Sequence, residues 1–202
     1  MNPHLTRAVV LLQQSRPDLA EKELRQALLA DPNDPRAHAF LSLCLAEQDK
    51  LEPATDEARA AIGAAPDEPL GHYALSVALR RRNRFDPARE AINEAIRLDP
   101  GDADHWGELA QIELNRRDWK GALAAAERGL AIDPENATCT NLRAVALVKL
   151  GRRAEAGATI DAALARDPDD PLTHANQGWT LLHAGEPRKA MEHFREALRL
   201  DP

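Results

Sequence analysis

The strongest constraint on the fold is an internal repeat with a period of 34 residues. The dipeptide Asp-Pro occurs at 31–32, 99–100, 133–134, 167–168 and 201–202, and Ala65-Pro66 fills the remaining step. A fixed period of this length is typical of a tandem array in which each repeat packs only against its neighbours. We therefore expect a single repeat domain over residues 1–202. Its repeats are 1–34, 35–68, 69–102, 103–136, 137–170 and 171–202.

Small residues recur at three positions of every repeat. The eighth and twenty-seventh positions hold only alanine, serine or glycine, and the twentieth position is always alanine. Small side chains let two helices approach closely, and a larger side chain would overpack the crossing. We therefore expect all three positions to lie at helix–helix contacts. The alanines of the twentieth position are Ala20, Ala54, Ala88, Ala122, Ala156 and Ala190.

Each repeat is predicted to form two helices joined by a turn. Apolar or small residues fall at positions 4, 7, 8 and 11 and again at positions 20, 24, 27 and 28, which is helical spacing. All 14 prolines lie outside the helix interiors that this spacing predicts, where each would cost about 3 kcal/mol. Four of the six expected turn residues readily adopt a left-handed backbone. The turn residues are Ser15, Asp49, Asn83, Arg117, Gly151 and Gly185.

The junctions between repeats carry signals for the start of a helix. An Asp, Asn or Glu ends each of the first five repeats, and three of these residues are followed by proline. An acidic or amide cap before a proline suits the unpaired amides of a first helical turn. The same pattern at Asp86-Pro87 predicts the start of the second helix of repeat three. The predicted caps between repeats are Asp34, Glu68, Asp102, Asn136 and Asp170.

These features resemble the tetratricopeptide repeat family, whose 34-residue helix-turn-helix carries W-x2-L-G-x2-Y, then A, F, A and a final P. Repeat four carries Trp106, Leu109 and Ala110, and repeat six carries Phe194 and Ala197 at matching positions. The resemblance implies an all-α fold, an α-α superhelix of about twelve antiparallel helices. Five repeats depart from it, with histidine or threonine at the tryptophan position. These residues are His4, His38, His72, Thr140 and His174.

The resemblance also implies a concave groove lined by the first helix of each repeat, which would hold a peptide or helix of a partner. Apolar residues and amides occupy the groove positions, a composition suited to such a ligand. The aliphatic residues at the ninth position have a second interpretation, in which they only pack neighbouring first helices together. The candidate partner-binding residues are Phe40, Leu43, Tyr73, Val77, Gln111, Asn141, Asn176 and Trp179.

Four arginines, Arg80, Arg81, Arg82 and Arg84, form the one dense basic cluster, at the turn of repeat three. A solvated turn is one interpretation. The other is an anchor for an acidic partner segment or for anionic lipid headgroups.

Several classes of function are disfavoured. The net charge of −7 without a basic half argues against nucleic acid. No stretch approaches the 18 or so apolar residues of a membrane span.

Neither a catalytic triad signature nor a phosphate loop is present, so we expect no enzyme and no cofactor. Four histidines share one position of their repeats and would lie apart along the array, so we expect them to pack rather than to bind metal. The cysteines Cys44 and Cys139 lack a disulfide or zinc spacing, which favours a reducing, cytoplasmic location.

Two function hypotheses remain. The first is a non-enzymatic adaptor that binds a protein or peptide in its groove. The second is a structural assembly module that self-associates end to end or carries a further domain of a longer chain. The second hypothesis depends on the last repeat, which ends at Asp201-Pro202 without the polar closing helix that repeat arrays use. We expect either a fragment of a longer chain or a terminal face that contacts another molecule.

Overall fold

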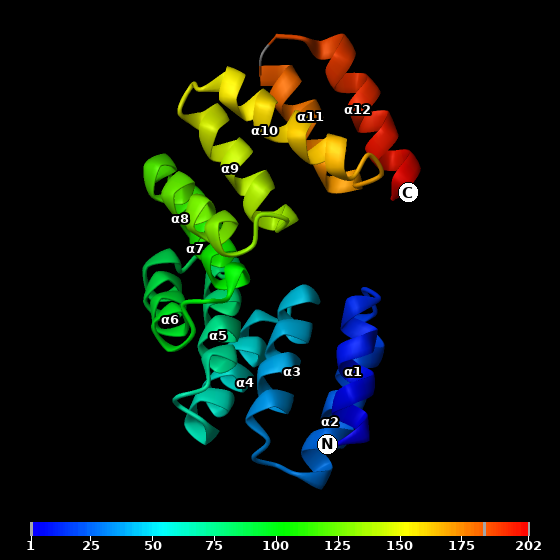
Figure 1. Cartoon of the computed structure of the whole chain (residues 1–202). Helices are drawn as coiled ribbons and strands as arrows, with labels where there is room; N and C mark the ends of the chain where they lie inside the picture. The colour runs from blue at the N-terminus through cyan, green and yellow to red at the C-terminus, as the bar shows by residue number, and fades with distance from the viewer. Residues whose placement is uncertain (1, 184, 202) are drawn as a thin grey trace. The chain divides into compact units, whose positions relative to one another are not determined.

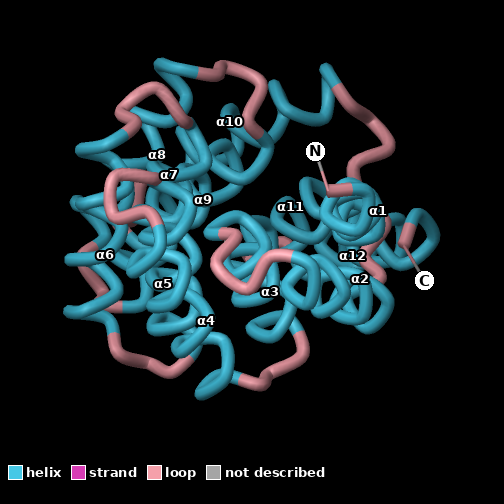
Figure 2. Tube along the Cα trace, turned by 90° about the horizontal axis from the view of Figure 1, so that it is seen from below, coloured by secondary structure: helices cyan, strands magenta, loops and turns pink. Residues whose placement is uncertain are grey.

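The computed structural model describes residues 2–183 and 185–201 and, within them, contains twelve α-helices and no strand (Figures 1 and 2). The expectation of an all-α fold of about twelve helices is therefore confirmed. Each repeat supplies a first helix with an odd number and a second helix with an even number. The helices are α1 (Pro3–Gln13), α2 (Pro17–Ala30), α3 (Pro35–Glu47), α4 (Leu51–Ala64), α5 (Pro69–Arg81), α6 (Phe85–Leu98), α7 (Ala103–Asn115), α8 (Trp119–Ile132), α9 (Ala137–Lys149), α10 (Arg153–Arg166), α11 (Pro171–His183) and α12 (Pro187–Leu200).

The chain divides into two compact units, Met1–Gly101 and Asp102–Pro202, with three helical hairpins each. Within each unit the first helices pack in a row, in which α3 contacts both α1 and α5, and α9 contacts both α7 and α11. Second helices also contact the first helix of the next hairpin, as α2 contacts α3 and α8 contacts α9. Within each unit, the hairpins thus pack against their neighbours in sequence. The expectation that all six repeats form one domain stays a prediction.

The six turns inside the repeats share one backbone geometry. Each contains a residue in the left-handed region, at the position that the sequence predicts. The amide of that residue donates to the carbonyl three residues back, and the next amide donates to the carbonyl five residues back. This pair of bonds satisfies the last carbonyls of the first helix. The φ angles are 54° at Ser15, 60° at Asp49, 58° at Asn83, 64° at Arg117, 76° at Gly151 and 83° at Gly185.

Most of the predicted helix caps are present. The side-chain oxygens of Asp34, Asp102, Asn136 and Asp170 accept hydrogen bonds from backbone amides of the following first turn. Glu68 ends its repeat in the capping position without such a side-chain bond.

The cap predicted at Asp86 is wrong. Helix α6 begins at Phe85 with Arg84 in the capping position, so Pro87 is the third residue of the helix. Amides of a first turn have no partner within their helix, so a proline there sacrifices no backbone hydrogen bond.

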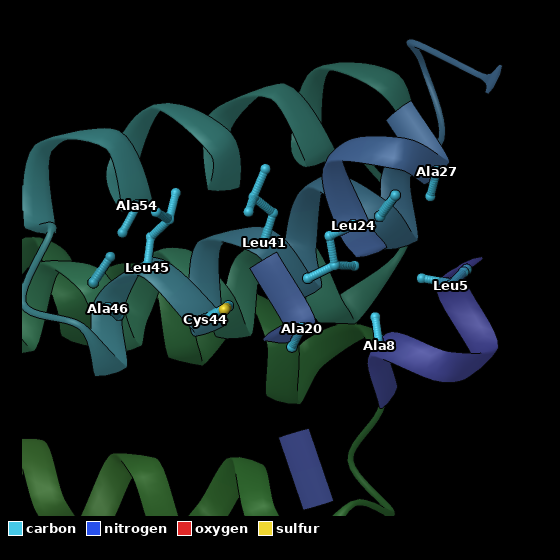
Figure 3. Packing of buried hydrophobic residues seen from close by; sticks show 12 residues of the cluster. Leu5, Ala8, Ala20, Leu24, Ala27, Leu41, Cys44, Leu45, Ala46 and Ala54 are labelled. Atoms are coloured by element: carbon cyan, nitrogen blue, oxygen red, sulfur yellow. The ribbon is translucent and has the colours of Figure 1, made fainter. Parts of the chain in front are cut away.

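The small-residue positions lie inside the hairpin contacts. All six alanines of the twentieth position are at most 1% exposed. In the first unit, Ala8, Ala20 and Ala27 surround Leu24, and this cluster continues along α3 (Figure 3). Ala197, at the twenty-seventh position of repeat six, is only half-buried. Across the described residues, each helix is too short or too polar to cross a membrane.

Candidate functional site

In the first unit, the candidate groove residues are partly packed. The side chains of Phe40 and Val77 pack against the core cluster that extends from α1 to α5, and both remain partly accessible. Leu43 packs against a second cluster formed by alanines of α3, α4 and α5. Tyr73 on α5 is also half-buried. Leu43 and Val77 therefore join neighbouring first helices and present only part of their surface to a ligand.

In the second unit, two candidate residues line one hollow of about 420 Å³. Asn176 and Trp179 form its α11 side together with Thr180. The α9 side is formed by Val145, Val148 and Lys149. All six residues come from first helices, which is the arrangement that the family resemblance implies. The hollow thus brings an exposed indole, two valines, an amide, a hydroxyl and an ammonium group together.

Trp179 is 55% exposed, and a neighbouring aromatic ring holds one side of it. The ring of Phe194 on α12 meets the indole edge to face, with centroids 5.5 Å apart and planes at 75°. Such aromatic pairs add to the stability that burial alone provides. A β-carbon on Gly178 would lie 2.5 Å from the Phe194 ring, so glycine is required for this approach. The packing of α12 on α11 therefore sets the position of the indole.

The two remaining groove candidates of this unit differ in burial. Asn141 lies one turn before Val145 on α9 and is only 5% exposed. Among the described residues, neither polar atom of its side-chain amide has a hydrogen-bond partner. Gln111 on α7 is half-buried, and its Nε2 atom donates to Oδ1 of Asn115 at 3.4 Å.

The arginine cluster of repeat three is not one exposed patch. The guanidinium group of Arg82 donates to Oε1 of Glu52 at 3.1 Å and to Oγ1 of Thr55 at 3.3 Å. Arg80 is half-buried, whereas Arg81 and Arg84 are exposed. Arg82 thus fastens the turn after α5 to α4 of the preceding repeat.

Three of the four recurrent histidines link the two helices of a hairpin. His4 and His38 place Nδ1 at 2.7 Å and 2.6 Å from a glutamate of the second helix, Glu23 and Glu57 respectively. The ring of His72 instead approaches the carbonyl of Pro66, 2.9 Å from Nε2. Within the part of the chain that the structure describes, no three His, Cys, Asp or Glu side chains gather closely enough to hold a metal ion.

Both cysteines are buried within the core. Burial raises the pKa of the Cys44 and Cys139 thiols to about 11. The thiolate is the nucleophilic form, and this pKa leaves very little of it at neutral pH. Neither thiol is therefore suited to covalent catalysis.

Four of the six residues that line the hollow are not among the candidates predicted from the sequence, namely Val145, Val148, Lys149 and Thr180. Val145 shares the ninth position with the aliphatic residues that pack first helices together. Val148 and Lys149 occupy the twelfth and thirteenth positions, which the family resemblance also places on the concave surface. The repeat periodicity is therefore a signal that could have found both residues. Thr180 occupies the tenth position, for which the resemblance gives no signal.

Comparison with known proteins identifies the same repeat. A family model described as tetratricopeptide repeat matches residues 5–69, 73–137 and 141–202. Among solved structures, a thermophilic protein of this repeat class from Thermus thermophilus, TTC0263, is 22% identical with a TM-score of 0.81. That match covers 89% of this chain and 97% of the other.

Two further structures are similar at comparable identity. Pseudomonas aeruginosa pilF is 19% identical with a TM-score of 0.74, over 98% of this chain and 90% of the other. YrrB, described as a TPR protein with an unusual peptide-binding site, is 18% identical with a TM-score of 0.59, over 89% of this chain and 92% of the other. No curated protein matches the sequence. At these identities the likeness extends to the fold alone.

Proposed function

The chain belongs to the tetratricopeptide repeat family, and we propose that it is a non-enzymatic scaffold that binds a peptide or helix of a partner protein in the groove of its first helices. The family fold suggests a protein–protein interaction scaffold, and the peptide site is the specific part of the proposal. The observation that carries it is the hollow between α9 and α11 with the exposed indole of Trp179.

The chemistry of the hollow suits a polypeptide ligand. Val145, Val148 and Trp179 offer an apolar surface for one ligand side chain. Asn176 and Thr180 can exchange hydrogen bonds with the amides of a ligand backbone. Lys149 adds a positive charge that favours an acidic residue or a carboxylate nearby. Apolar walls with a few polar groups are typical of ligand sites, and the peptide-binding site described for YrrB offers a precedent within the fold.

A second candidate function is self-association, and exposed apolar side chains of the last repeat favour it. Leu172 and Leu182 on α11 are 52% and 43% exposed, and Met191 and Leu198 on α12 are 52% and 67% exposed. Large apolar side chains that are left exposed in one molecule can pack against a second molecule. Sedimentation velocity over a wide concentration range tests this candidate, because a chain that stays monomeric throughout excludes it.

We also propose a reducing compartment such as the cytoplasm. This rests on Cys44 and Cys139, which are both free and buried. Disulfide bonds are rare in such compartments.

The test of peptide binding starts from a random peptide library selected on the full chain, followed by calorimetry with the best peptide. We expect Trp179→Ala to weaken the binding of that peptide by ~2 kcal/mol or more, the scale of an interface hot spot. The control is Leu29→Ala, because Leu29 is 75% exposed on α2, in the other unit. A peptide that binds both variants as well as the parent, or a library without any enriched peptide, would contradict the proposal.

A further inference from the structure

Two histidine rings meet between the helices of the last hairpin. Nδ1 of His174 on α11 lies 3.0 Å from Nδ1 of His193 on α12. Their ring centroids are 5.2 Å apart, with the planes inclined by 33°. Nε2 of His174 lies 2.8 Å from the backbone oxygen of Pro168. His174 therefore uses both ring nitrogens, one toward a carbonyl and one toward a second imidazole.

These distances define how many protons the pair can hold. The oxygen of Pro168 only accepts, so Nε2 of His174 must carry a hydrogen. A neutral His174 then presents a lone pair at Nδ1, and Nδ1–H of His193 donates to it. One additional proton is tolerated, because a charged His174 can donate from Nδ1 to a His193 whose hydrogen is on Nε2. A second additional proton would place two N–H groups and two positive charges against each other.

The same position in repeat two holds a different pair. Both ring nitrogens of His38 face oxygens, the carbonyl oxygen of Pro32 at 3.0 Å and a carboxylate oxygen of Glu57 at 2.6 Å. Glu57, whose carboxylate accepts hydrogen bonds, takes the place that the second imidazole has in repeat six. Residues 57 and 193 occupy the same position of their repeats. The exchange of glutamate for histidine therefore changes the response of the hairpin to protons.

The surroundings of His193 disfavour its charged form. Burial and then the charge of His174 hold the pKa of His193 below its ordinary value of 6.5. Glu192 on α12 and Asp161 on α10 act in the other direction without cancelling the effect. The unfolded chain thus binds this proton more readily than the folded chain. The stabilising contribution is complete above pH 6.5 and is lost as the pH falls through the lowered pKa.

The charged side chains near His174 form ion pairs with one another. Glu196 on α12 faces His174 and is bonded to Arg199, with oxygen and nitrogen 2.6 Å apart. Arg199 also lies 4.0 Å from Asp169 of the loop before α11. The two ring nitrogens of His174 thus face a carbonyl and an imidazole, whereas one nitrogen of His38 faces a carboxylate.

We propose that His174 and His193 form a pH-sensitive clasp between α11 and α12, which is closed while the pair carries at most one additional proton and opens when both rings are charged. Phe194 follows His193 on α12 and packs against Trp179. Opening the clasp would therefore loosen the α11 wall of the hollow. The consequence for partner binding rests on the proposed function, whereas the opening itself does not.

Hydrogen–deuterium exchange of the full chain tests the clasp without any partner. Protection factors of the α12 amides are compared at about pH 7.5 and about pH 5, on either side of the histidine range, with those of α4 as the reference. We expect α12 to lose protection by about tenfold relative to α4, because two charged rings at this contact favour the open hairpin. Equal changes in the two helices would overturn the proposal.

Two substitutions distinguish an effect of the clasp from a general loss of stability in acid. His193→Glu gives repeat six the histidine–glutamate pair of repeat two, and we expect it to abolish the loss of protection in α12. Glu57→His gives repeat two the histidine pair. We expect the α4 amides of this variant to lose protection at about pH 5, with the α2 amides as the reference. Because the exchanges lie in different units, one remains informative if the other variant does not fold. A folded His193→Glu chain that still loses α12 protection like the parent would overturn the proposal.

Discussion

The Sγ atom of Cys139 fills the space that a β-carbon on residue 129 would need. Gly129 lies on α8 at the twenty-seventh position of repeat four, where all other repeats have alanine. Cys139 lies on α9 of the next repeat and is fully buried. The glycine in one repeat and the sulfur in the next are thus two halves of one packing arrangement.

Gly129→Ala should therefore destabilise the chain by about 1–3 kcal/mol through overpacking. Once Cys139→Ala has removed the sulfur, the same change should cost much less, because the nearest remaining neighbour of the β-carbon is the backbone oxygen of Ala103 at 3.3 Å. Urea unfolding of both single variants and the double variant measures the coupling. Additive effects would show that the sulfur does not exclude the β-carbon.

The turn residues allow a matched pair of substitutions. Arg117 and Gly151 both have a positive φ angle, 64° and 76°, in equivalent turns of the second unit. A side chain raises the energy of this backbone by about 1–2 kcal/mol. We expect Arg117→Gly to raise the melting temperature and Gly151→Ala to lower it. Shifts of the same sign would show that other contacts of the turn dominate.

Ala88 is fully buried on α6, and a larger side chain should be poorly tolerated there. We expect Ala88→Leu to lower the free energy of unfolding by about 1–3 kcal/mol. Ala60→Leu is the control, because Ala60 is exposed on α4 of the same unit. Unfolding curves that coincide for the two variants would contradict a tight crossing at Ala88.

The sequence predicted the parts of the fold that recur in every repeat. The period, the paired helices and the left-handed turn residues follow from comparing equivalent positions. Contacts between different positions were not predicted, because each depends on two side chains that change together. Gly129 with Cys139 and His174 with His193 are such pairs. The site was predicted in part for the same reason, since Trp179 stands out alone whereas Thr180 matters only beside it.

Acid should weaken the first unit through Glu21, a carboxylate on α2 that is only 5% exposed. Burial acts to raise the pKa of Glu21, but hydrogen bonds from Lys50 and Gln48 and the charge of Arg25 outweigh it and hold that pKa below 4.5. Its Oε2 atom accepts from Nε2 of Gln48 at 2.7 Å and from Nζ of Lys50 at 2.9 Å. The stabilising contribution is thus present above pH 4.5 and is lost as the pH falls through the lowered pKa.

Glu21→Gln should accordingly cost about 1–3 kcal/mol at neutral pH, because it removes charged hydrogen bonds in a buried setting. The difference from the parent should shrink as the pH falls below 4.5 and through the lowered pKa, because the parent carboxyl then becomes neutral as well. Urea unfolding at several pH values measures this difference. A gap between the two chains that is independent of pH would exclude the charge of Glu21 as its cause.

Asn141 should lower the stability of the free chain and contribute to peptide binding. Its buried amide lacks a hydrogen-bond partner within the described residues, and an unpaired buried polar group costs about 1–3 kcal/mol. Asn141→Leu should therefore raise the melting temperature of the chain without a ligand. If a bound peptide completes the hydrogen bonds of this amide, the same variant should bind the selected peptide several-fold more weakly.

Thermal melts and calorimetry on one protein preparation separate the two effects. The control is Asn93→Leu, because Asn93 is an exposed asparagine on α6, in the other unit. If the Asn141 amide binds the peptide, Asn141→Leu should raise the stability of the free chain and lower its affinity for the peptide, whereas the control variant should not show this combination. The reason is that the unpaired amide destabilises the free chain and gains its hydrogen bonds only from the ligand. Higher stability with unchanged affinity would place the bound peptide away from Asn141, and lower stability would show that the amide is paired in the free chain, through bound water for instance.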